Sequence, residues 1–133
     1  MLECKIDGTF DLDEIIRETQ QGGEILAYAT TRFKDYMNKY VPMSAGYLVD
    51  GVYIPPGNLR KSAKANPEEG TVSYNAPYAH AQYVGYTTGP VVNYTTPGTG
   101  KYWDELMATA EGDLFIKEIE EFTKRRMQWE QRN

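Results

Sequence analysis

The sequence predicts a fold in which helices from the two halves of the chain pack on one small sheet. Helical periodicity over Glu24–Tyr40 is the first observation, and a second helical segment over 102–129 is the next. The third is an alternation of polar and apolar side chains over 71–74, which is typical of a half-buried strand. A chain of 133 residues can bury one hydrophobic core, so we expect a single domain over 1–133.

The composition indicates a folded, soluble protein. Charged residues make up 25% of the chain and hydrophobic residues 41%. No apolar run approaches the roughly 18 residues of a membrane span, and the acidic N-terminus differs from a signal peptide. We therefore expect a protein kept or assembled in the cytoplasm, without a membrane partner. The net charge of −5 argues against a protein that binds nucleic acid by neutralising phosphates.

The sequence predicts no catalytic residue, no metal site and no cofactor. His80 is the only histidine, and we expect it to have a structural hydrogen-bonding role. Cys4 is the only cysteine, and we expect it to act as a small apolar residue. The Gly-Thr-Gly-Lys segment 98–101 lacks the spacing of a phosphate-binding loop. The carboxylates of 104–121 are expected on solvated helix faces, where paired acid–base chemistry has no support. We therefore predict that the protein is not an enzyme.

The N-terminal third predicts a strand or ordered arm over 2–10 and then two helices. Asp11, with Glu14 three residues later, forms a capping pair for a short helix that ends at the glycine pair 22–23. Its apolar face comprises Leu12, Ile15, Ile16 and Thr19. The apolar face of the second helix comprises Ile25, Leu26, Ala29, Phe33, Tyr36, Met37 and Tyr40. The two segments either pack separately on the sheet or form one helix broken at the glycines.

The middle of the chain predicts a small protruding hairpin and a tyrosine-rich element. Asp50-Gly51 between two short apolar runs is a β-hairpin signal. Residues 59–65 fit either a helical turn or a strand. In the stretch 70–85 a strand ends at Asn75, and a short helix follows the proline. We expect Tyr74, Pro77, Tyr78 and Tyr83 to form the structural heart of this rigid contact surface.

The C-terminal third predicts a loop over 86–101, with an edge strand over 91–94, and then a long helix. The buried side of that helix is expected to comprise Trp103, Leu106, Met107, Ala110, Leu114, Ile119 (or Phe115) and Phe122. Gly112-Asp113 suggests a kink or restart. Acidic residues come early and basic residues late, an order that the helix dipole favours.

Four motifs together resemble a known protein family. They are Val41-Pro42-Met43-Ser44-Ala45-Gly46-x-Leu48, Asn58-Leu59-Arg60-Lys61-Ser62-Ala63, the block from Gly70 to Gly85 with its Asn75-x-Pro77-Tyr78-Ala79-His80 run, and Thr96-Pro97-Gly98-Thr99-Gly100-x-x-Trp103. Over about 36–125 the chain resembles minor capsid proteins of long-tailed phages of Gram-positive bacteria, which are similar to tail-completion or head–tail joining proteins. Ala45 replaces the usual Thr, the hairpin separates the first two motifs, and the segment after Gly85 is shorter than in many relatives.

The resemblance implies an α+β fold, with an N-terminal helix or helix pair and a C-terminal helix on a small, mostly antiparallel sheet. It implies a non-enzymatic structural role in the virion neck, where tail meets head, after assembly in the host cytoplasm. We expect a homo-oligomeric ring that contacts the stopper or connector and the tail terminator, with DNA passing nearby but not bound specifically. The family-motif residues are Gly46, Leu59, Arg60, Ser62, Tyr74, Pro77, Tyr78, His80, Tyr83, Gly85 and Trp103.

Surface tyrosines and late basic residues are the candidate partner contacts. They are Tyr47, Tyr53, Tyr86, Tyr94, Arg125 and Arg126. If the protein lines a DNA passage, the acidic face 104–121 or the acidic N-terminal helix points inward, and Arg60, Lys61, Lys64 and 124–126 face neighbouring subunits. Equally, all these charges can be solvated helix faces of little energetic weight. The alternative function is a small tyrosine-rich module that binds a protein or a sugar without catalysis.

Overall fold

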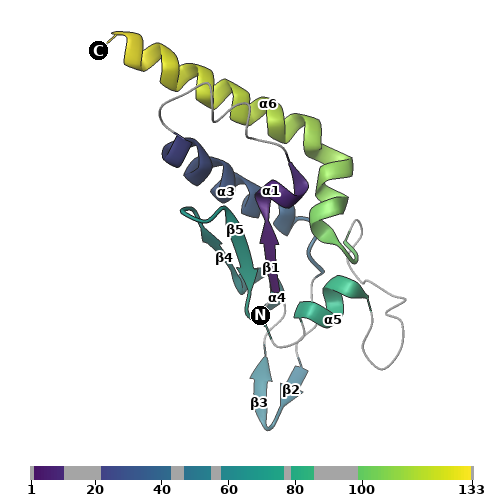
Figure 1. Ribbon diagram of the computed structural model, residues 1–133. Coiled ribbons are helices and arrows are strands. Elements are labelled where there is room, and N and C mark those ends of the chain that lie inside the picture. Colours follow the sequence, from purple (N-terminus) through teal and green to yellow (C-terminus); the bar gives the residue numbers. More distant parts are fainter. Residues whose placement is uncertain are drawn as a thin grey trace.

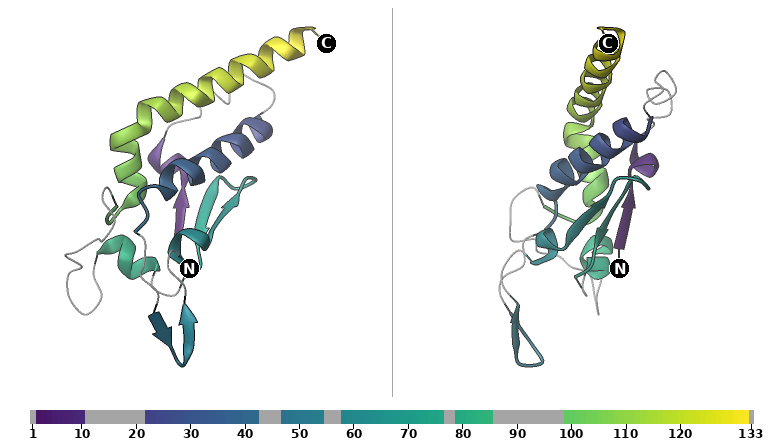
Figure 2. Two further views of the ribbon diagram at one scale, coloured as in Figure 1. Left: turned by 180° about the vertical axis from the view of Figure 1, so that it is seen from behind. Right: turned by 90° about the vertical axis from the view of Figure 1, so that its left-hand side faces the viewer.

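The protein has a three-stranded antiparallel sheet covered by two long helices (Figure 1). The computed structural model describes residues 2–10, 22–42, 47–54, 58–76, 79–85 and 99–132. The strands β1 (Leu2–Lys5), β5 (Thr71–Tyr74) and β4 (Ala63–Asn66) lie in the order β1-β5-β4. Helix α3 (Gly22–Asn38) lies between this sheet and α6 (Trp103–Arg132), as both views in Figure 2 show. The α+β prediction is confirmed.

Shorter elements complete the described chain. A single helical turn α1 (Ile6–Thr9) follows β1, so the N-terminal segment is a strand and a turn of helix. The hairpin strands are β2 (Tyr47–Val49) and β3 (Val52–Ile54), as predicted. The segment 59–65, which fits either a helical turn or a strand by sequence, divides between α4 (Asn58–Lys61) and β4. The predicted short helix after the central strand is α5 (Ala79–Val84).

Gly70 is the residue that allows β1 to join the sheet beside the β4–β5 turn. Its φ of 68° lies in the left-handed region, which favours glycine. A Cβ atom there would lie 3.1 Å from the side chain of Ile6 and 3.2 Å from that of Leu26. The Gly70 carbonyl also accepts a 2.9 Å hydrogen bond from the Ile6 amide. A side chain at this position would be strained by the backbone conformation and would require Ile6 and Leu26 to shift by a few tenths of an ångström.

One cluster of apolar side chains fills the space between the sheet, α3 and α6. The predicted face of α3 is confirmed, since Ile25, Ala29, Phe33 and Met37 are fully buried and the remaining members pack against the cluster. Cys4 is also buried, as expected for a small apolar residue, and burial raises the pKa of its thiol to about 12. This cluster fixes how α3 sits on the sheet.

The buried side of α6 differs from the predicted one. Leu106 and Leu114 are 36% and 60% exposed and Ala110 is exposed, so their predicted burial is wrong. The buried residues are Trp103, Met107, Gly112, Phe115, Ile119 and Thr123. These residues are four apart on average, so the buried face rotates around the helix by about 40° from one to the next. The packing partners change along with it: Trp103 packs on β5 and α5, whereas Phe115 packs on Phe10 and on α3.

Gly112 does not break α6. The helix is continuous from 103 to 132, although it curves within its N-terminal half (Figure 1). A Cβ atom on Gly112 would lie 3.4 Å from the ring of Phe10. Of the two predicted alternatives, a kink or a restart, the restart is therefore wrong and only a bend without a break remains. The glycine gives room for an aromatic ring beside the helix. The predicted first helix, with Asp11 and Glu14, and the predicted edge strand 91–94 lie outside the described residues.

Candidate functional site

The Leu-Arg-x-Ser motif fixes the end of α3. Leu59 is buried in the core, and the Ser62 hydroxyl donates a 2.7 Å hydrogen bond to the Leu59 carbonyl. Nε of Arg60 donates to the Val41 carbonyl at 2.8 Å, and its Nη2 to the Lys39 carbonyl at 3.3 Å. Carbonyls beyond a helix C-terminus lack backbone partners, and a cation there also suits the helix dipole. Arg60 therefore bonds within the fold, which argues against the predicted role in a subunit salt bridge.

Replacing Arg60 by Met should lower the free energy of unfolding by about 1–2 kcal/mol, because two carbonyls lose a charged donor while the apolar stem is kept. Urea denaturation at neutral pH measures the difference. Lys61→Met on the same turn is the matched control, since Lys61 is exposed. Equal losses for the two variants would refute this role of Arg60.

The central aromatic residues form one cluster with the start of α6. The buried ring of Tyr74 lies edge-on to Trp103, with centroids 5.4 Å apart, and Tyr83 lies edge-on to the same indole at 4.9 Å. The hydroxyl of Tyr74 donates to Oδ1 of Asn38 at 3.0 Å, and that of Tyr83 to Oδ1 of Asp104 at 2.7 Å. Burial raises the pKa of both phenols. The cluster joins β5, α5 and α6.

The remaining family-motif residues are less completely described. Gly85 ends α5 with a φ of 74°, the left-handed conformation common after a helix. Gly46, Pro77 and Tyr78 lie outside the described residues. The backbone of His80 belongs to α5, but its side chain is outside the described part of the chain. Their predicted roles stay predictions.

A polar network around Glu118 joins α3 to α6. Its carboxylate accepts hydrogen bonds from Nε and Nη2 of Arg32 at 2.7 and 3.3 Å, from the Tyr36 hydroxyl at 3.1 Å and from the Tyr28 hydroxyl at 3.2 Å. The Tyr28 ring also stacks on Phe122, with centroids 3.9 Å apart. The hydrogen bond from Arg32 is the main reason why the pKa of Glu118 is lowered.

A second carboxylate continues this network two helical turns earlier. Glu111 accepts from Nζ of Lys39 at 2.7 Å and from the Tyr40 hydroxyl at 2.8 Å. The hydrogen bond from Lys39 lowers the pKa of Glu111, whereas burial and the bond to Glu111 raise the pKa of Tyr40 to about 12. The expectation that the 104–121 carboxylates are all solvated is thus wrong for Asp104, Glu111 and Glu118. The spacing of Tyr28, Arg32, Tyr36 and Tyr40, each one turn apart, was the sequence signal for this network.

The β2–β3 hairpin projects from the end of the molecule opposite to the C-terminus (Figure 1). Asp50 and Gly51 have φ values of 49° and 80°, the left-handed pair that a two-residue hairpin turn requires. Beyond the turn, Val52 is 61% exposed and Tyr53 is 60% exposed. The side chain of Tyr47 lies outside the described residues. The hairpin thus presents Asp50, Val52 and Tyr53 to solvent, and we refer to these three residues as the hairpin tip.

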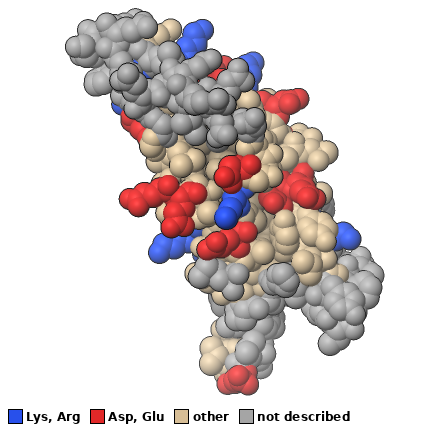
Figure 3. All heavy atoms as spheres, viewed as in Figure 1, with Lys and Arg blue, Asp and Glu red and all other residues tan. Residues whose placement is uncertain are grey.

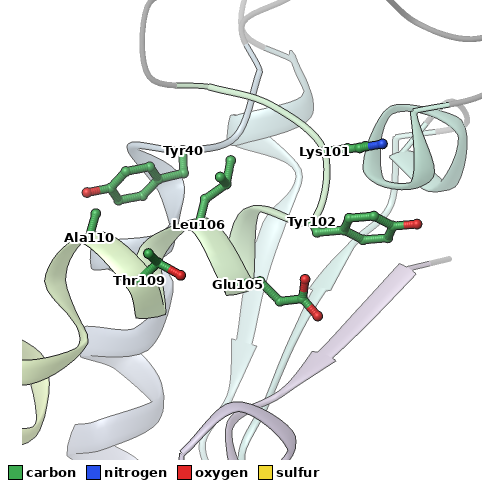
Figure 4. A pocket seen from close by; sticks show the side chains of 7 residues that line it. All are labelled: Tyr40, Lys101, Tyr102, Glu105, Leu106, Thr109 and Ala110. Atoms are coloured by element: carbon green, nitrogen blue, oxygen red, sulfur yellow. The ribbon is translucent and has the colours of Figure 1, made fainter.

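An open depression of about 520 Å³ lies over the first turns of α6. We refer to it as the α6 depression; it is lined by Tyr40, Lys101, Tyr102, Glu105, Leu106, Thr109 and Ala110. In Figure 4, Leu106 lies at its middle, between Tyr40 on one side and Tyr102 with Lys101 on the other. The side chain of Leu106 and the ring of Tyr102 are apolar, and the two residues are partly exposed, at 36% and 37%. They give the depression a largely apolar floor.

Two backbone hydrogen bonds hold the segment that enters α6. The Gly100 amide donates to the Tyr40 carbonyl at 3.3 Å, and the Tyr102 amide donates to the Tyr83 carbonyl at 2.9 Å. Tyr102 has a φ of 51°, which is rare for a bulky residue and costs conformational energy. The fold therefore keeps Tyr102 in a strained conformation with its ring at the edge of the α6 depression.

The late basic residues of α6 differ in their surroundings. Nη2 of Arg126 donates to Oε2 of Glu24 at 2.8 Å, so this guanidinium joins α6 to the start of α3. Arg125 is exposed. Tyr86 and Tyr94 lie outside the described residues. Of the predicted partner contacts, Tyr53 and Arg125 are those with described, exposed side chains.

Charges of both signs cover the surface. Acidic side chains gather across the middle of the face in Figure 3, with basic side chains among them. Within the described ranges there is no group of three or more His, Cys, Asp or Glu residues that could hold a metal ion. None of the described helices is long and apolar enough to cross a membrane.

Comparison with known proteins identifies the family. A family model described as minor capsid protein matches residues 15–125, which include α3, β4, β5 and most of α6. The resemblance to minor capsid proteins inferred from the sequence motifs is thereby confirmed, and it extends further toward the N-terminus. No curated protein and no solved structure matches the chain. The chain therefore belongs to the minor capsid protein family and is a structural component of a virion.

Proposed function

We propose that this minor capsid protein is a ring-forming subunit of the neck of a long-tailed phage of Gram-positive bacteria, where it joins the tail to the head. The family match over 15–125 is the observation that carries the proposal. The shape of the subunit supports it, because a hairpin and a long helix project from opposite ends of the body (Figure 2). Such a subunit offers separate surfaces to neighbours within a ring and to proteins above or below it.

Passage of DNA through the ring requires a wall that does not bind phosphates tightly. The carboxylates of Asp104, Glu111 and Glu118 accept hydrogen bonds from tyrosine hydroxyls within the same subunit. Among the described side chains of α6, the exposed carboxylates that remain and do not line the α6 depression are Asp113, Glu120 and Glu121. We propose that this side of α6 faces the passage. The stopper or connector and the tail terminator would bind above and below.

The alternative of a small tyrosine-rich sugar-binding module has less support. A site for a small ligand encloses most of the ligand surface. The α6 depression is instead open to solvent, which suits contact with a protein surface.

Charge reversal at Arg125 should impair the joining of heads to tails while the subunit remains folded. Arg125→Glu places a like charge against an acidic partner, and a tenfold loss of joined particles corresponds to about 1.4 kcal/mol. Arg126 is left unchanged, because Arg126→Glu would also place two carboxylates beside each other at Glu24. Electron microscopy of lysates from a complemented deletion phage measures joined particles against free heads and tails.

Lys117→Glu is the matched control, since Lys117 is an exposed cation on the same helix. Deletion of the gene should itself give filled heads and separate tails, and immunogold should label the neck. Label spread over the capsid surface, or normal joining after deletion, would refute the neck assignment.

A further inference from the structure

We propose that subunits associate head to tail, with the hairpin tip of one copy seated in the α6 depression of the next. This inference rests on the ring part of the proposed function and names the surfaces that form the ring. Both surfaces are present on each chain: the hairpin projects away from the body (Figure 1), and the depression lies over the first turns of α6. Such a contact is heterologous, so its repetition closes a ring or extends a filament.

The hairpin is the element that most needs a partner. A two-stranded hairpin alone is marginally stable in water, and β2 and β3 form a sheet separate from the three-stranded one. Its turn is nevertheless well specified by Asp50 and Gly51, and it presents Val52 and Tyr53 with about two fifths of each residue covered. A stiff turn that exposes a tyrosine and a branched apolar residue is suited to fill a neighbouring hollow.

The α6 depression matches the hairpin tip in polarity and charge. Exposed Leu106 and Tyr102 offer an apolar floor to the valine and the tyrosine ring. Lys101 is exposed at the edge and can pair with the carboxylate of Asp50. The carboxylate of Glu105 can accept a hydrogen bond from the hydroxyl of Tyr53. Tyrosine-to-carboxylate bonds of this kind already hold the fold together at Glu111 and Glu118.

The strained Tyr102 supports a role for the α6 depression. Bulky residues persist in the left-handed region where the surrounding structure holds them, and such residues cluster at functional sites. The Gly100 amide donates to Tyr40, which follows α3, and the Tyr102 amide donates to Tyr83 of α5, so the wall is formed before a partner arrives. A preformed hollow lowers the ordering cost of binding.

The contact is small. A stable interface covers roughly 800 Å² on each partner, and one hairpin tip offers much less. We therefore expect weak association between isolated pairs and strong association once a ring closes, because each subunit then makes the contact twice.

Cross-linking between two single-cysteine variants tests the inference. Tyr53→Cys and Leu106→Cys proteins are mixed and treated with a short bismaleimide, and heterodimers are resolved by mass spectrometry. The native Cys4 stays as background, because it is buried and its thiol pKa is about 12. Leu106→Cys is replaced by Leu114→Cys in the matched control, since Leu114 is exposed on the same helix but does not line the depression. Thermal melting verifies that each variant is folded.

We expect at least about a tenfold higher yield from the Tyr53–Leu106 pair than from the Tyr53–Leu114 pair, corresponding to a contact preference of about 1.4 kcal/mol. Asp50→Asn, which keeps a side chain suited to the turn, and Lys101→Gln should each lower the yield up to about fivefold, and together by little more than either alone. Equal yields for the two cysteine pairs, or a dominant Tyr53–Tyr53 product, would overturn the proposed contact.

The same cysteines in assembled particles separate this inference from the proposed function. A Tyr53–Leu106 product from a protein located elsewhere than the neck would support the contact and refute the neck assignment. A protein found at the neck without this product in particles would refute the contact alone.

Discussion

Replacing Phe115 by Ala should lower the free energy of unfolding by about 3–5 kcal/mol, the usual loss for a fully buried aromatic ring. Phe115 has no exposed surface. Its ring packs at 4.7 Å from Phe10, 5.4 Å from Tyr36 and 6.2 Å from Phe33 between centroids. Truncation therefore opens a cavity where α1, α3 and α6 meet. Urea denaturation followed by circular dichroism measures the loss.

Leu114→Ala is the matched control, because it truncates the neighbouring apolar residue on the same helix. Leu114 is 60% exposed, so its replacement should change the free energy of unfolding by no more than about 0.5 kcal/mol. The pair also tests the rotation of α6 about its axis. A larger loss for Leu114→Ala than for Phe115→Ala would mean that the helix buries its other face.

Replacing Glu118 by Ala should cost about 2–3 kcal/mol at neutral pH. The change removes four hydrogen bonds and leaves the guanidinium of Arg32 without its main partner in α6. The side chains of Arg32 and Glu118 are 35% and 26% exposed, so water replaces part of what is lost and keeps the effect below that of a buried ion pair. Glu120→Ala is the matched control, because Glu120 is exposed on the same helix.

The pH dependence of Glu118→Gln distinguishes charge from packing at this position. The pKa of Glu118 is lowered in the folded protein, chiefly by the hydrogen bond from Arg32. Its ionised form therefore stabilises the fold fully above the unfolded pKa of about 4.3, and this contribution is lost as the pH falls through the lower folded pKa. The stability difference between the wild type and Glu118→Gln should be largest near neutral pH and should shrink below about pH 4.

Denaturation curves at several pH values measure that difference. Glu111 keeps its own lowered pKa, so both proteins should still lose stability in acid. A difference that stays constant from neutral pH to strongly acidic pH would mean that the carboxylate charge contributes nothing to the α3–α6 contact.

Much of the local structure was predictable because it depends on neighbouring residues. The apolar spacing from Ile25 to Met37 specified both α3 and its buried face. Asp50-Gly51 specified the hairpin turn, since these residue types accept a positive φ. The 71–74 alternation specified the central strand. The motif residues around it were enough to indicate the minor capsid family.

The candidate interaction surfaces were only partly predictable. Tyr53 was recognisable as an exposed tyrosine, because it follows a turn in a short hairpin. The α6 depression was not, because its lining comes from Tyr40 just after α3, from the entry segment and from α6. Leu106 was assigned to the core, since it lies three residues after Trp103 and four before Ala110, the spacing of one helical face. Its exposure depends on the change of packing partner along α6.

By itself, the sequence determined the positions of α3, α5, α6, the strand β5 and the β2–β3 hairpin, which face of α3 is buried and which family the chain belongs to. Only the tertiary structure decided which side of α6 is buried and what its charges bind. Glu118 and Arg32 are 86 residues apart, and Arg60 reaches carbonyls 19 and 21 positions before it. Local patterns report backbone preferences and apolar faces within a few residues. The partner of a charged side chain depends instead on how two distant elements are rotated and placed against each other, which the packing of the whole core fixes.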